Sequence, residues 1–388
     1  MTGSRRFVSK SFLFQINTTR DCNLRCTHCY ISSAKKDLSH FMAEEDLLKI
    51  FDSIVEFLNS PQGLREYILA DVHIIGGEPT LLGLEYYKSA VPQIRERLAK
   101  VKQQVKLSIV TNLVTPESVA ISKLFDNVAT SYEIDTRFVS AKGRPLPKLE
   151  EQWAKHCTQL QDAGQPVNVT TAVTRQVIQH GAERLLNDFL ARGFRNIHLG
   201  FFIPSGDGLI HMGSVFPPFH ETSAFMIEAA KWYLARREEY PNLYVNPVES
   251  MIESIYRKVP MDDIVCPIIP GSLDFDPDGK AVTCIEAGGE VDMDSIGNVF
   301  EVGVLGIIQS PKYRRERTKA IVPKAHCMGC DELVNCQSAC GILHNYWNGR
   351  GECPGFKDFI KFIRKLVEVD GILPRSAMTE TTSQWRGC

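Results

Sequence analysis

The spacing of twelve cysteines is the feature that most limits what this chain of 388 residues can fold into. Three of them, Cys22, Cys26 and Cys29, lie in one short segment, and seven more lie between residues 266 and 353. Secreted proteins that depend on disulfides are usually short, and residues 1–17 lack the long apolar core of a signal peptide. Clustered cysteines in a long chain without such a signal indicate metal or redox chemistry.

The first half of the chain alternates short β-like runs with amphipathic helical segments. Residues 43–60 illustrate the helical pattern, because Leu47, Ile54 and Leu58 recur at helical spacing. Strands that alternate with helices of this length predict a parallel sheet covered by helices. Six such units are fewer than a full eight-fold barrel. We therefore expect an α/β fold, a partial (β/α)6 TIM-like barrel with its ligands at the C-terminal ends of the strands. The expected strands cover residues 12–19, 71–75, 105–112, 127–135, 166–174 and 196–204.

Composition and charge argue against several other classes of protein. With 44% hydrophobic and 23% charged residues, the composition is that of an ordinary globular protein. The net charge of -2 lacks the basic excess that nucleic-acid binding usually requires. No apolar run reaches about 18 residues, the length of a transmembrane helix. We expect a cytoplasmic protein without membrane or nucleic-acid partners.

The first three cysteines form a CxxxCxxC motif directly after the first expected strand. Three thiolates on one tight loop can bind three irons of a [4Fe–4S] cubane and leave the fourth iron open. A zinc-binding loop is the alternative for three cysteines alone. The motif resembles the hallmark of the radical S-adenosylmethionine (SAM) superfamily. That resemblance implies that Cys22, Cys26 and Cys29 hold a cluster whose open iron binds SAM, and that SAM cleavage yields a 5′-deoxyadenosyl radical.

A second motif, Gly76-Gly77-Glu78-Pro79, follows the second expected strand. Glycines allow close approach of the backbone to a ligand, and a glutamate accepts hydrogen bonds from an ammonium group. Taken alone, the motif is also typical of a tight turn. It resembles the GGEP motif of the same superfamily, which implies contact with the SAM amino group. The resemblance adds weaker candidates for SAM contact, each equally typical of a strand-end cap or a loop residue: His28, Thr111, Asn112, Ser131, Asp135 and Thr170.

The C-terminal cysteines form an extended array with defined spacing. Their order is Cys266, Cys284, Cys327-x2-Cys330-x5-Cys336-x3-Cys340 and Cys353. The array resembles the seven-cysteine signature of SPASM domains, which bind two auxiliary [4Fe–4S] clusters. A zinc ribbon is the alternative for residues 327–340. The resemblance implies three [4Fe–4S] clusters in all, with SAM as the cosubstrate.

The same resemblance distributes these cysteines between two clusters. The outer cluster takes Cys327, Cys330, Cys336 and Cys353, and the inner cluster takes Cys266, Cys284 and Cys340. The inner cluster therefore lacks a fourth cysteine from the motif. Its fourth iron is open, or is bound by Cys157, Cys388, a non-cysteine residue or the substrate. By default, Cys157 is a buried structural thiol and Cys388 a free thiol.

Five segments follow from these patterns. They are an N-terminal arm (1–11), a radical SAM partial barrel (12–215), a helical bridge (216–261), a small cysteine-rich α+β SPASM domain (262–356), and a C-terminal helix with a mobile tail (357–388). Within the fourth segment, residues 276–279 predict a hairpin turn.

Auxiliary clusters suit reactions in which a substrate radical loses an electron after hydrogen abstraction. SPASM relatives act mostly on ribosomally made peptides, so the resemblance implies an oxidoreductase that modifies a precursor-peptide side chain, a crosslink being one outcome. Ile285 stands where sulfatase maturases carry an aspartate, which argues against that activity. The alternatives are oxidation or rearrangement of a small metabolite such as an amino sugar, and, as a non-enzyme, an iron–sulfur electron carrier.

No catalytic acid or base is assigned from the sequence. Tyr30, Glu133, Asp135 and Asp207 fall at expected strand ends or in the loops that follow them, where carboxylates are common. The expected electron donor is flavodoxin or ferredoxin.

Overall fold

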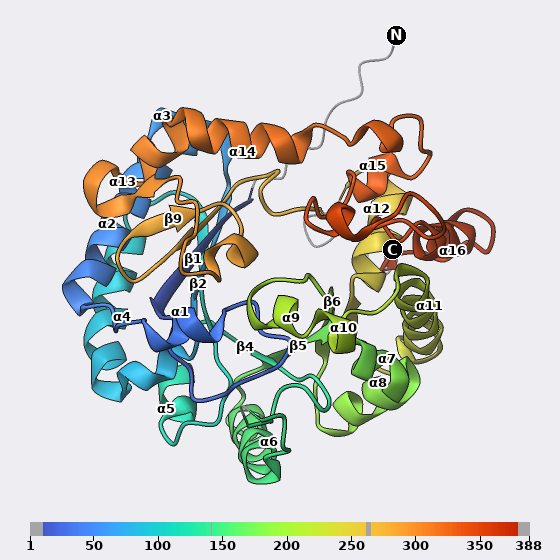
Figure 1. Cartoon of the computed structure of the whole chain (residues 1–388), viewed down its shortest axis with the longest axis horizontal. Helices are drawn as coiled ribbons and strands as arrows, with labels where there is room; N and C mark the ends of the chain where they lie inside the picture. Colours follow the sequence, from blue (N-terminus) through green and yellow to red (C-terminus); the bar gives the residue numbers. More distant parts are fainter. Residues whose placement is uncertain (1–10, 141, 261–264, 379–388) are drawn as a thin grey trace, which may run out of the picture.

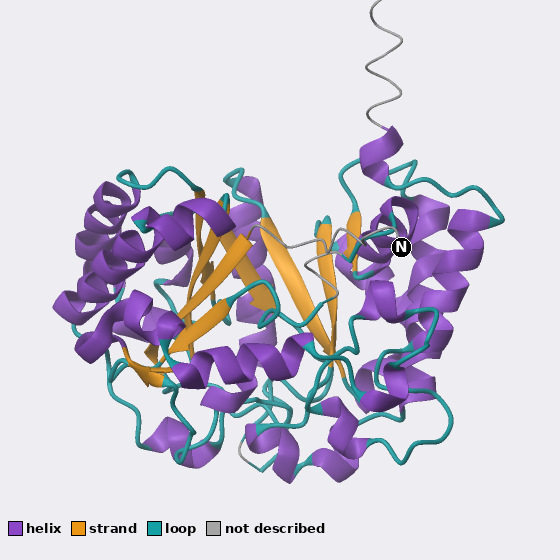
Figure 2. Cartoon of the chain, turned by 90° about the horizontal axis from the view of Figure 1, so that it is seen from above, coloured by secondary structure: helices purple, strands orange, loops and turns teal. Residues whose placement is uncertain are grey.

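The computed structural model describes residues 11–140, 142–260 and 265–378, which are built around one curved sheet (Figures 1 and 2). The strand order is β10-β9-β8-β1-β2-β3-β4-β5-β6-β7, and every pair from β8 through β7 is parallel. The α/β partial barrel predicted from the sequence is confirmed, and its six strands are β1 to β6. The strands are β1 (Ser11–Thr19), β2 (Leu69–Gly76), β3 (Gln104–Val110), β4 (Asn127–Ser131), β5 (Val167–Val173), β6 (Asn196–Phe201), β7 (Tyr244–Asn246), β8 (Ser272–Phe275), β9 (Lys280–Val282) and β10 (Gly297–Asn298).

Helices cover the outer face of the sheet (Figure 1). Those that connect the barrel strands are α1 (Ser33–Asp37), α2 (Glu44–Asn59), α3 (Pro61–Glu66), α4 (Leu84–Leu98), α5 (Ser118–Ser122), α6 (Pro147–Asp162), α7 (Arg175–His180) and α8 (Ala182–Ala191). Those that follow β6 are α9 (Gly206–Ile210), α10 (Met212–Val215), α11 (Phe219–Arg236), α12 (Val248–Arg257), α13 (Val299–Gln309), α14 (Pro311–Ile321), α15 (Leu333–Cys336) and α16 (Lys357–Glu368). Short 3-10 turns are η1 (Pro79–Leu82), η3 (Ile285–Gly288), η4 (Ala325–Cys327) and η5 (Leu343–Tyr346).

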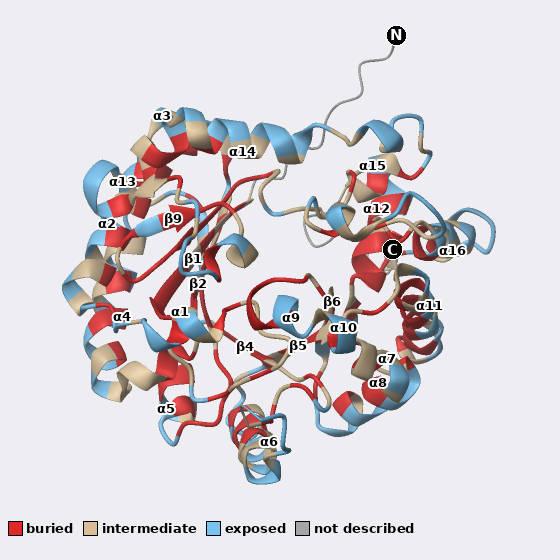
Figure 3. Cartoon of the chain, viewed as in Figure 1, coloured by how far each residue is buried: buried red, intermediate tan, exposed pale blue. Residues whose placement is uncertain are grey.

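Alternation of apolar residues explains why the first strand forms where it does. Phe12, Phe14 and Ile16 are fully buried, as expected for one face of a strand that packs against helices. Phe57 of α2 meets two of these rings, at centroid distances of 5.2 Å from Phe12 and 6.2 Å from Phe14. Figure 3 shows that the buried residues follow the strands and the inner faces of the helices, so the core lies between sheet and helix layer.

Four strands extend the sheet beyond the six expected units, β7 at one end and β8 to β10 at the other. Strand β7 pairs with β6 within the segment expected to be a helical bridge, between α11 and α12. Strand β8, in the cysteine-rich segment, pairs in parallel with β1, with Phe275 opposite Ile16. The hairpin turn expected at residues 276–279 joins β8 to β9, and Gly279 has a φ of +80° there. The cysteine-rich segment therefore begins as a continuation of the barrel sheet.

The C-terminal segment is held against the bridge helices as far as it is described. Arg375 donates hydrogen bonds to the hydroxyl of Tyr233 and to the carbonyl oxygen of Pro241, at 2.9 Å each. Residues 373–378 thus dock onto α11 and the turn after it. Cys388 lies outside the described residues. Within the described ranges, no helix has both the length and the apolar character needed to span a membrane.

Candidate active site and cluster-binding cysteines

The three N-terminal cysteines lie on one loop, residues 20–32, which follows β1 and is called the cluster loop below. Burial raises the pKa of the Cys22 thiol to about 12, and the charges of Glu78 and Cys29 add to this effect. Burial also raises the pKa of Cys26, with contributions from Cys29 and Cys22. The loop therefore brings three sulfurs together in a site where thiolates need a cation. This donor set fits a [4Fe–4S] cluster held through three irons.

The end of the cluster loop is fixed by glycines from two distant segments. The Gly208 N–H donates a hydrogen bond of 2.9 Å to the carbonyl oxygen of Cys29. A Cβ atom on Gly206 would lie 2.2 Å from the carbonyl oxygen of Tyr30, and one on Gly289 would lie 1.9 Å from the same oxygen. Only glycine allows such close backbone approach. The third cysteine is therefore positioned jointly by the loop after β6 and by the cysteine-rich segment.

The GGEP motif continues the pairing of β1 with β2 into the cluster loop. The N–H of Gly77 donates to the carbonyl oxygen of Thr19 at 2.9 Å, and the N–H of Glu78 donates to that of Asp21 at 2.8 Å. A Cβ on Gly77 would lie 2.0 Å from the Asp21 oxygen. Glycine is thus needed here partly because the backbone of the GGEP motif packs directly against the cluster loop, and not only because it approaches a ligand. Pro79 follows as the first residue of η1.

The buried carboxylate of Glu78 connects the ends of β2 and β3. Its oxygens accept hydrogen bonds from the N–H of Thr80 (3.0 Å), the hydroxyl of Thr111 (2.7 Å) and the N–H of Asn112 (2.6 Å). The side-chain amide of Asn112 in turn donates to the side-chain oxygen of Asn23 on the cluster loop at 2.6 Å. Glu78, Thr111 and Asn112, all expected at the SAM site, therefore form one network under the cysteines.

His28 lies in a buried ionic cluster between the cluster loop and the ends of β4 and β5. Its Nε2 is 3.0 Å from Oε2 of Glu133, which also pairs with Arg137 at 3.3 Å. The backbone N–H of Ala172 donates to the other carboxylate oxygen at 3.0 Å. Burial alone would raise the pKa of Glu133, but His28, Arg137 and this N–H lower it to about 2. The Nδ1 atom of His28 is buried without a partner among the described residues, as fits a ring that meets a ligand.

The other SAM-contact candidates after β4 are placed differently. Ser131 and Thr170 are paired across β4 and β5, and both are half-buried. Asp135 is exposed and has a φ of +56°. Of the two acids in this segment, Glu133 is the one whose carboxylate reaches the cluster loop.

Replacing Glu133 by Gln is expected to reduce the acid sensitivity of the fold. A carboxyl whose pKa falls to about 2 on folding contributes stability above its unfolded pKa of about 4.5, and this is lost as the pH drops toward 2. The variant should lose about 1–3 kcal/mol at pH 7 and show a flatter decline below pH 4.5. Urea unfolding across that range measures it, with exposed Glu151→Gln as the control. If the free energy of unfolding of parent and variant declined in parallel with falling pH, Glu133 would not have a lowered pKa in the folded state.

A buried lysine places positive charge beside the cysteines. Lys36 is 2% exposed, and its Nζ is 2.9 Å from Oδ2 of Asp207. Asp207 also accepts from the N–H of Ser33 at 2.7 Å, which joins α9 to α1. Burial lowers the pKa of Lys36, but the charge of Cys29 and the contact with Asp207 outweigh it and raise the pKa. The lysine is therefore a cation that offsets thiolate charge at the cluster loop.

A second buried ionic network joins the cluster loop to β8. The Arg20 guanidinium is 2.9 Å from Oδ2 of Asp274 and 2.7 Å from Oδ1 of Asp276, and Lys35 also pairs with Asp276. The charge of Arg20 and its hydrogen bonds thus hold the cysteine-rich segment against the barrel. The sequence analysis did not identify Arg20, Lys36, Arg137 or Asp274. Arg20 and Lys36 could have been singled out in the sequence, because both are basic residues close to the CxxxCxxC motif.

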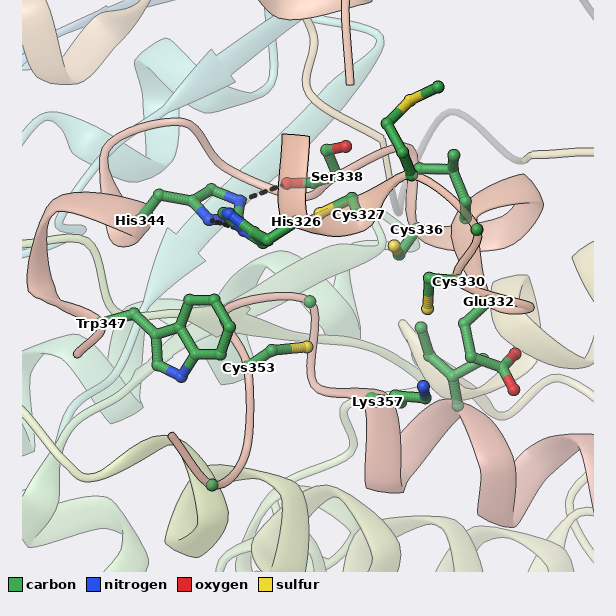
Figure 4. A pocket seen from close by; sticks show the side chains of 16 residues that line it. His326, Cys327, Cys330, Glu332, Cys336, Ser338, His344, Trp347, Cys353 and Lys357 are labelled. Carbon is green, nitrogen blue, oxygen red and sulfur yellow. Dashed lines mark hydrogen bonds between the residues drawn. The ribbon is translucent and has the colours of Figure 1, made fainter. Parts of the chain in front are cut away.

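The four cysteines assigned to the outer cluster surround a single cavity (Figure 4). The cavity has a volume of about 390 Å³, and its lining includes Cys327, Cys330, Cys336 and Cys353. His326 and His344 also line the cavity, and Nε2 of His326 lies 3.1 Å from Nδ1 of His344. Four thiols around one space of this size are suited to a cluster or to zinc.

The three cysteines assigned to the inner cluster form a second group. Burial raises the pKa of Cys284, with a contribution from the charge of Cys340, and raises that of Cys340 to about 11, with a contribution from Cys266. Cys157 belongs to the apolar core on α6 and is 2% exposed. All eleven cysteines of the described residues are free thiols, so disulfides do not compete for them.

Comparison with known proteins identifies a domain. Residues 16–177, which carry the cluster loop, the GGEP motif and the ends of β3 and β4, match the profile of the Radical SAM superfamily. No curated protein sequence matches the chain.

Several solved structures share the fold along nearly the whole chain. A structure of anSMEcpe with bound AdoMet matches with a TM-score of 0.74 at 15% identity, covering 95% of this chain and 97% of that one. Another, of anSMEcpe with AdoMet and the Cp18Cys peptide, has a TM-score of 0.71 at 16% identity, with coverages of 93% and 99%. Streptococcus suis SuiB bound to its precursor peptide SuiA has a TM-score of 0.60 at 15% identity, with coverages of 89% and 74%. These likenesses show a common fold.

Proposed function

We propose that the chain is a radical SAM enzyme, since residues 16–177 match the profile of that superfamily, and that it oxidatively modifies a side chain of a ribosomally made peptide. The observation that carries the chemistry is the convergence of the three cysteines, the GGEP motif and the polar ends of β3 and β4 at one edge of the barrel. The peptide substrate is supported by two structures with this fold that hold peptides, the Cp18Cys complex of anSMEcpe and the SuiA complex of SuiB.

In this proposal, Cys22, Cys26 and Cys29 hold a [4Fe–4S] cluster, which supplies one electron to the SAM sulfonium and so starts hydrogen abstraction. The chain's own residues bind and orient SAM. Residues 76–79 would contact its amino group, and the hydrogen bond from the Asn112 N–H would hold Glu78 in position for this. His28, whose Nδ1 is buried without a partner among the described residues, would contact the adenosyl group. The weaker contacts are Thr111, Ser131 and Asp135.

We further propose two auxiliary [4Fe–4S] clusters in the C-terminal array. The outer one takes the four thiols around the cavity of Figure 4, and the inner one takes Cys266, Cys284 and Cys340. Both would carry the electron that a substrate radical gives up, and flavodoxin or ferredoxin would supply the reducing electron. This chemistry requires a reducing, oxygen-poor compartment, consistent with a cytoplasmic location.

A substrate-class assay tests the proposal. The reduced, anaerobic enzyme is incubated with SAM and either the peptides encoded next to its gene or a panel of amino sugars. We expect 5′-deoxyadenosine to form whether or not a candidate substrate is added. A product that has two hydrogens fewer than its substrate should form only when a peptide is present. One hydrogen atom passes to the 5′-deoxyadenosyl radical, and a proton and an electron leave afterwards. Deuterium placed on the modified side chain should appear in 5′-deoxyadenosine. Oxidation of an amino sugar, with peptides inert, would overturn the peptide assignment.

A further inference from the structure

The inner group of cysteines offers three thiols for a cubane that has four irons. Among the described residues, the remaining cysteine outside the three proposed ligand sets is Cys157, which is packed in the core on α6. A fourth protein ligand among the described residues must therefore be something other than cysteine.

Glu286 is the carboxylate that reaches this group. The Cys284 thiol donates a hydrogen bond of 2.8 Å to Oε2 of Glu286. The carboxylate of Glu286 thus lies directly against one of the proposed ligands of the inner cluster.

The backbone around Glu286 fixes where its side chain lies. Glu286 sits in η3, directly after Cys284, and the turn closes through a hydrogen bond of 3.0 Å from the N–H of Ala287 to the carbonyl oxygen of Cys284. The next residue, Gly288, packs so closely on the cluster-loop network that a Cβ there would lie 2.6 Å from Nη2 of Arg20. The position of the carboxylate is therefore set by the barrel as well as by its own turn.

We propose that Glu286 is the fourth ligand of the inner auxiliary cluster and binds, through a carboxylate oxygen, the iron that the three thiolates leave free. The proposal rests on the auxiliary clusters of the proposed function. Carboxylate oxygen is an established ligand of iron, and exchanging a thiolate for another donor changes the reduction potential of a cluster. An oxygen ligand is also easier to displace than a thiolate, because it is the harder donor.

The test uses the full chain with Cys22, Cys26 and Cys29 all replaced by alanine, so that only auxiliary clusters remain. This parent is compared with versions that also carry Glu286→Gln, Glu286→Cys or the control Glu290→Gln, an exposed acid next to the same turn. Iron and sulfide are counted after anaerobic reconstitution. The EPR spectrum of the reduced protein is then recorded with and without cyanide, which binds an open iron.

We expect the parent and the Glu290→Gln control to hold about eight irons and to resist cyanide. Glu286→Gln should show a cyanide-dependent EPR change or lose the inner cluster, leaving about four irons. Glu286→Cys should restore the iron content and the resistance to cyanide, but its EPR spectrum should differ from that of the parent. Identical spectra and cyanide responses for parent and Glu286→Gln would overturn the ligand assignment and leave Glu286 as a neighbouring acid. A parent that takes up no iron would instead refute the auxiliary clusters themselves.

Discussion

Single alanine substitutions at Cys22, Cys26 or Cys29 should each reduce 5′-deoxyadenosine formation to the level of a protein-free control. In the proposed function each thiol holds one iron of the SAM-binding cluster, and the other cysteines of the described residues lie in the core or in the C-terminal groups. The loop cannot easily recruit a substitute, because close contacts with Gly206, Gly208 and Gly289 fix its end. The nucleoside is quantified by chromatography after anaerobic incubation with SAM and dithionite.

The matched control for these variants is Cys157→Ala. It removes one buried thiol from the core and should cost about 1 kcal/mol of stability without lowering the yield of 5′-deoxyadenosine. Thermal unfolding of all four variants separates loss of the cluster from loss of the fold. Substantial 5′-deoxyadenosine from any of the three cluster-loop variants, at parental iron content, would contradict the role of that cysteine.

The barrel could be predicted from the sequence because its signals are local. The alternation of apolar residues predicted β1. The apolar residues that recur at helical spacing in α2 are the ones that the structure buries. The cluster loop and the GGEP motif could be assigned to one edge, because the C-terminal ends of parallel strands lie on the same side of a sheet.

What the sequence did not provide is pairing across long separations. The contact of β8 with β1 brings Asp274 opposite Gln15, and no local pattern encodes that register. The sequence also did not tell whether Asp135 or Glu133 reaches the cluster loop, for a different reason. Strand β4 ends at Ser131, so alternation no longer tells which later side chain points inward, and the chain turns through a positive φ at Asp135.

Replacing Arg20 by methionine should destabilise the fold by about 3–5 kcal/mol, since it leaves two buried carboxylates without their main cation. Arg20 is 1% exposed and lies between Asp274 and Asp276, which are 1% and 3% exposed. Methionine approximates the length of the arginine stem, so packing changes less than charge. Urea unfolding measures the loss, and adding Asp274→Asn to Arg20→Met should recover part of it, because the added asparagine removes one unpaired charge.

The pH dependence distinguishes a charge effect from a packing effect. Burial raises the pKa of Asp274 to about 6 although Arg20 lowers it, against an ordinary value of 3.8. The folded state therefore binds this proton more tightly than the unfolded state, and stability declines as the pH rises from about 4 to about 6. Without Arg20 the pKa should rise further, which extends that decline to higher pH. The deficit of Arg20→Met should thus be larger at pH 8 than at pH 5. Equal deficits at the two pH values would show that lost packing, not the unpaired carboxylates, causes the instability.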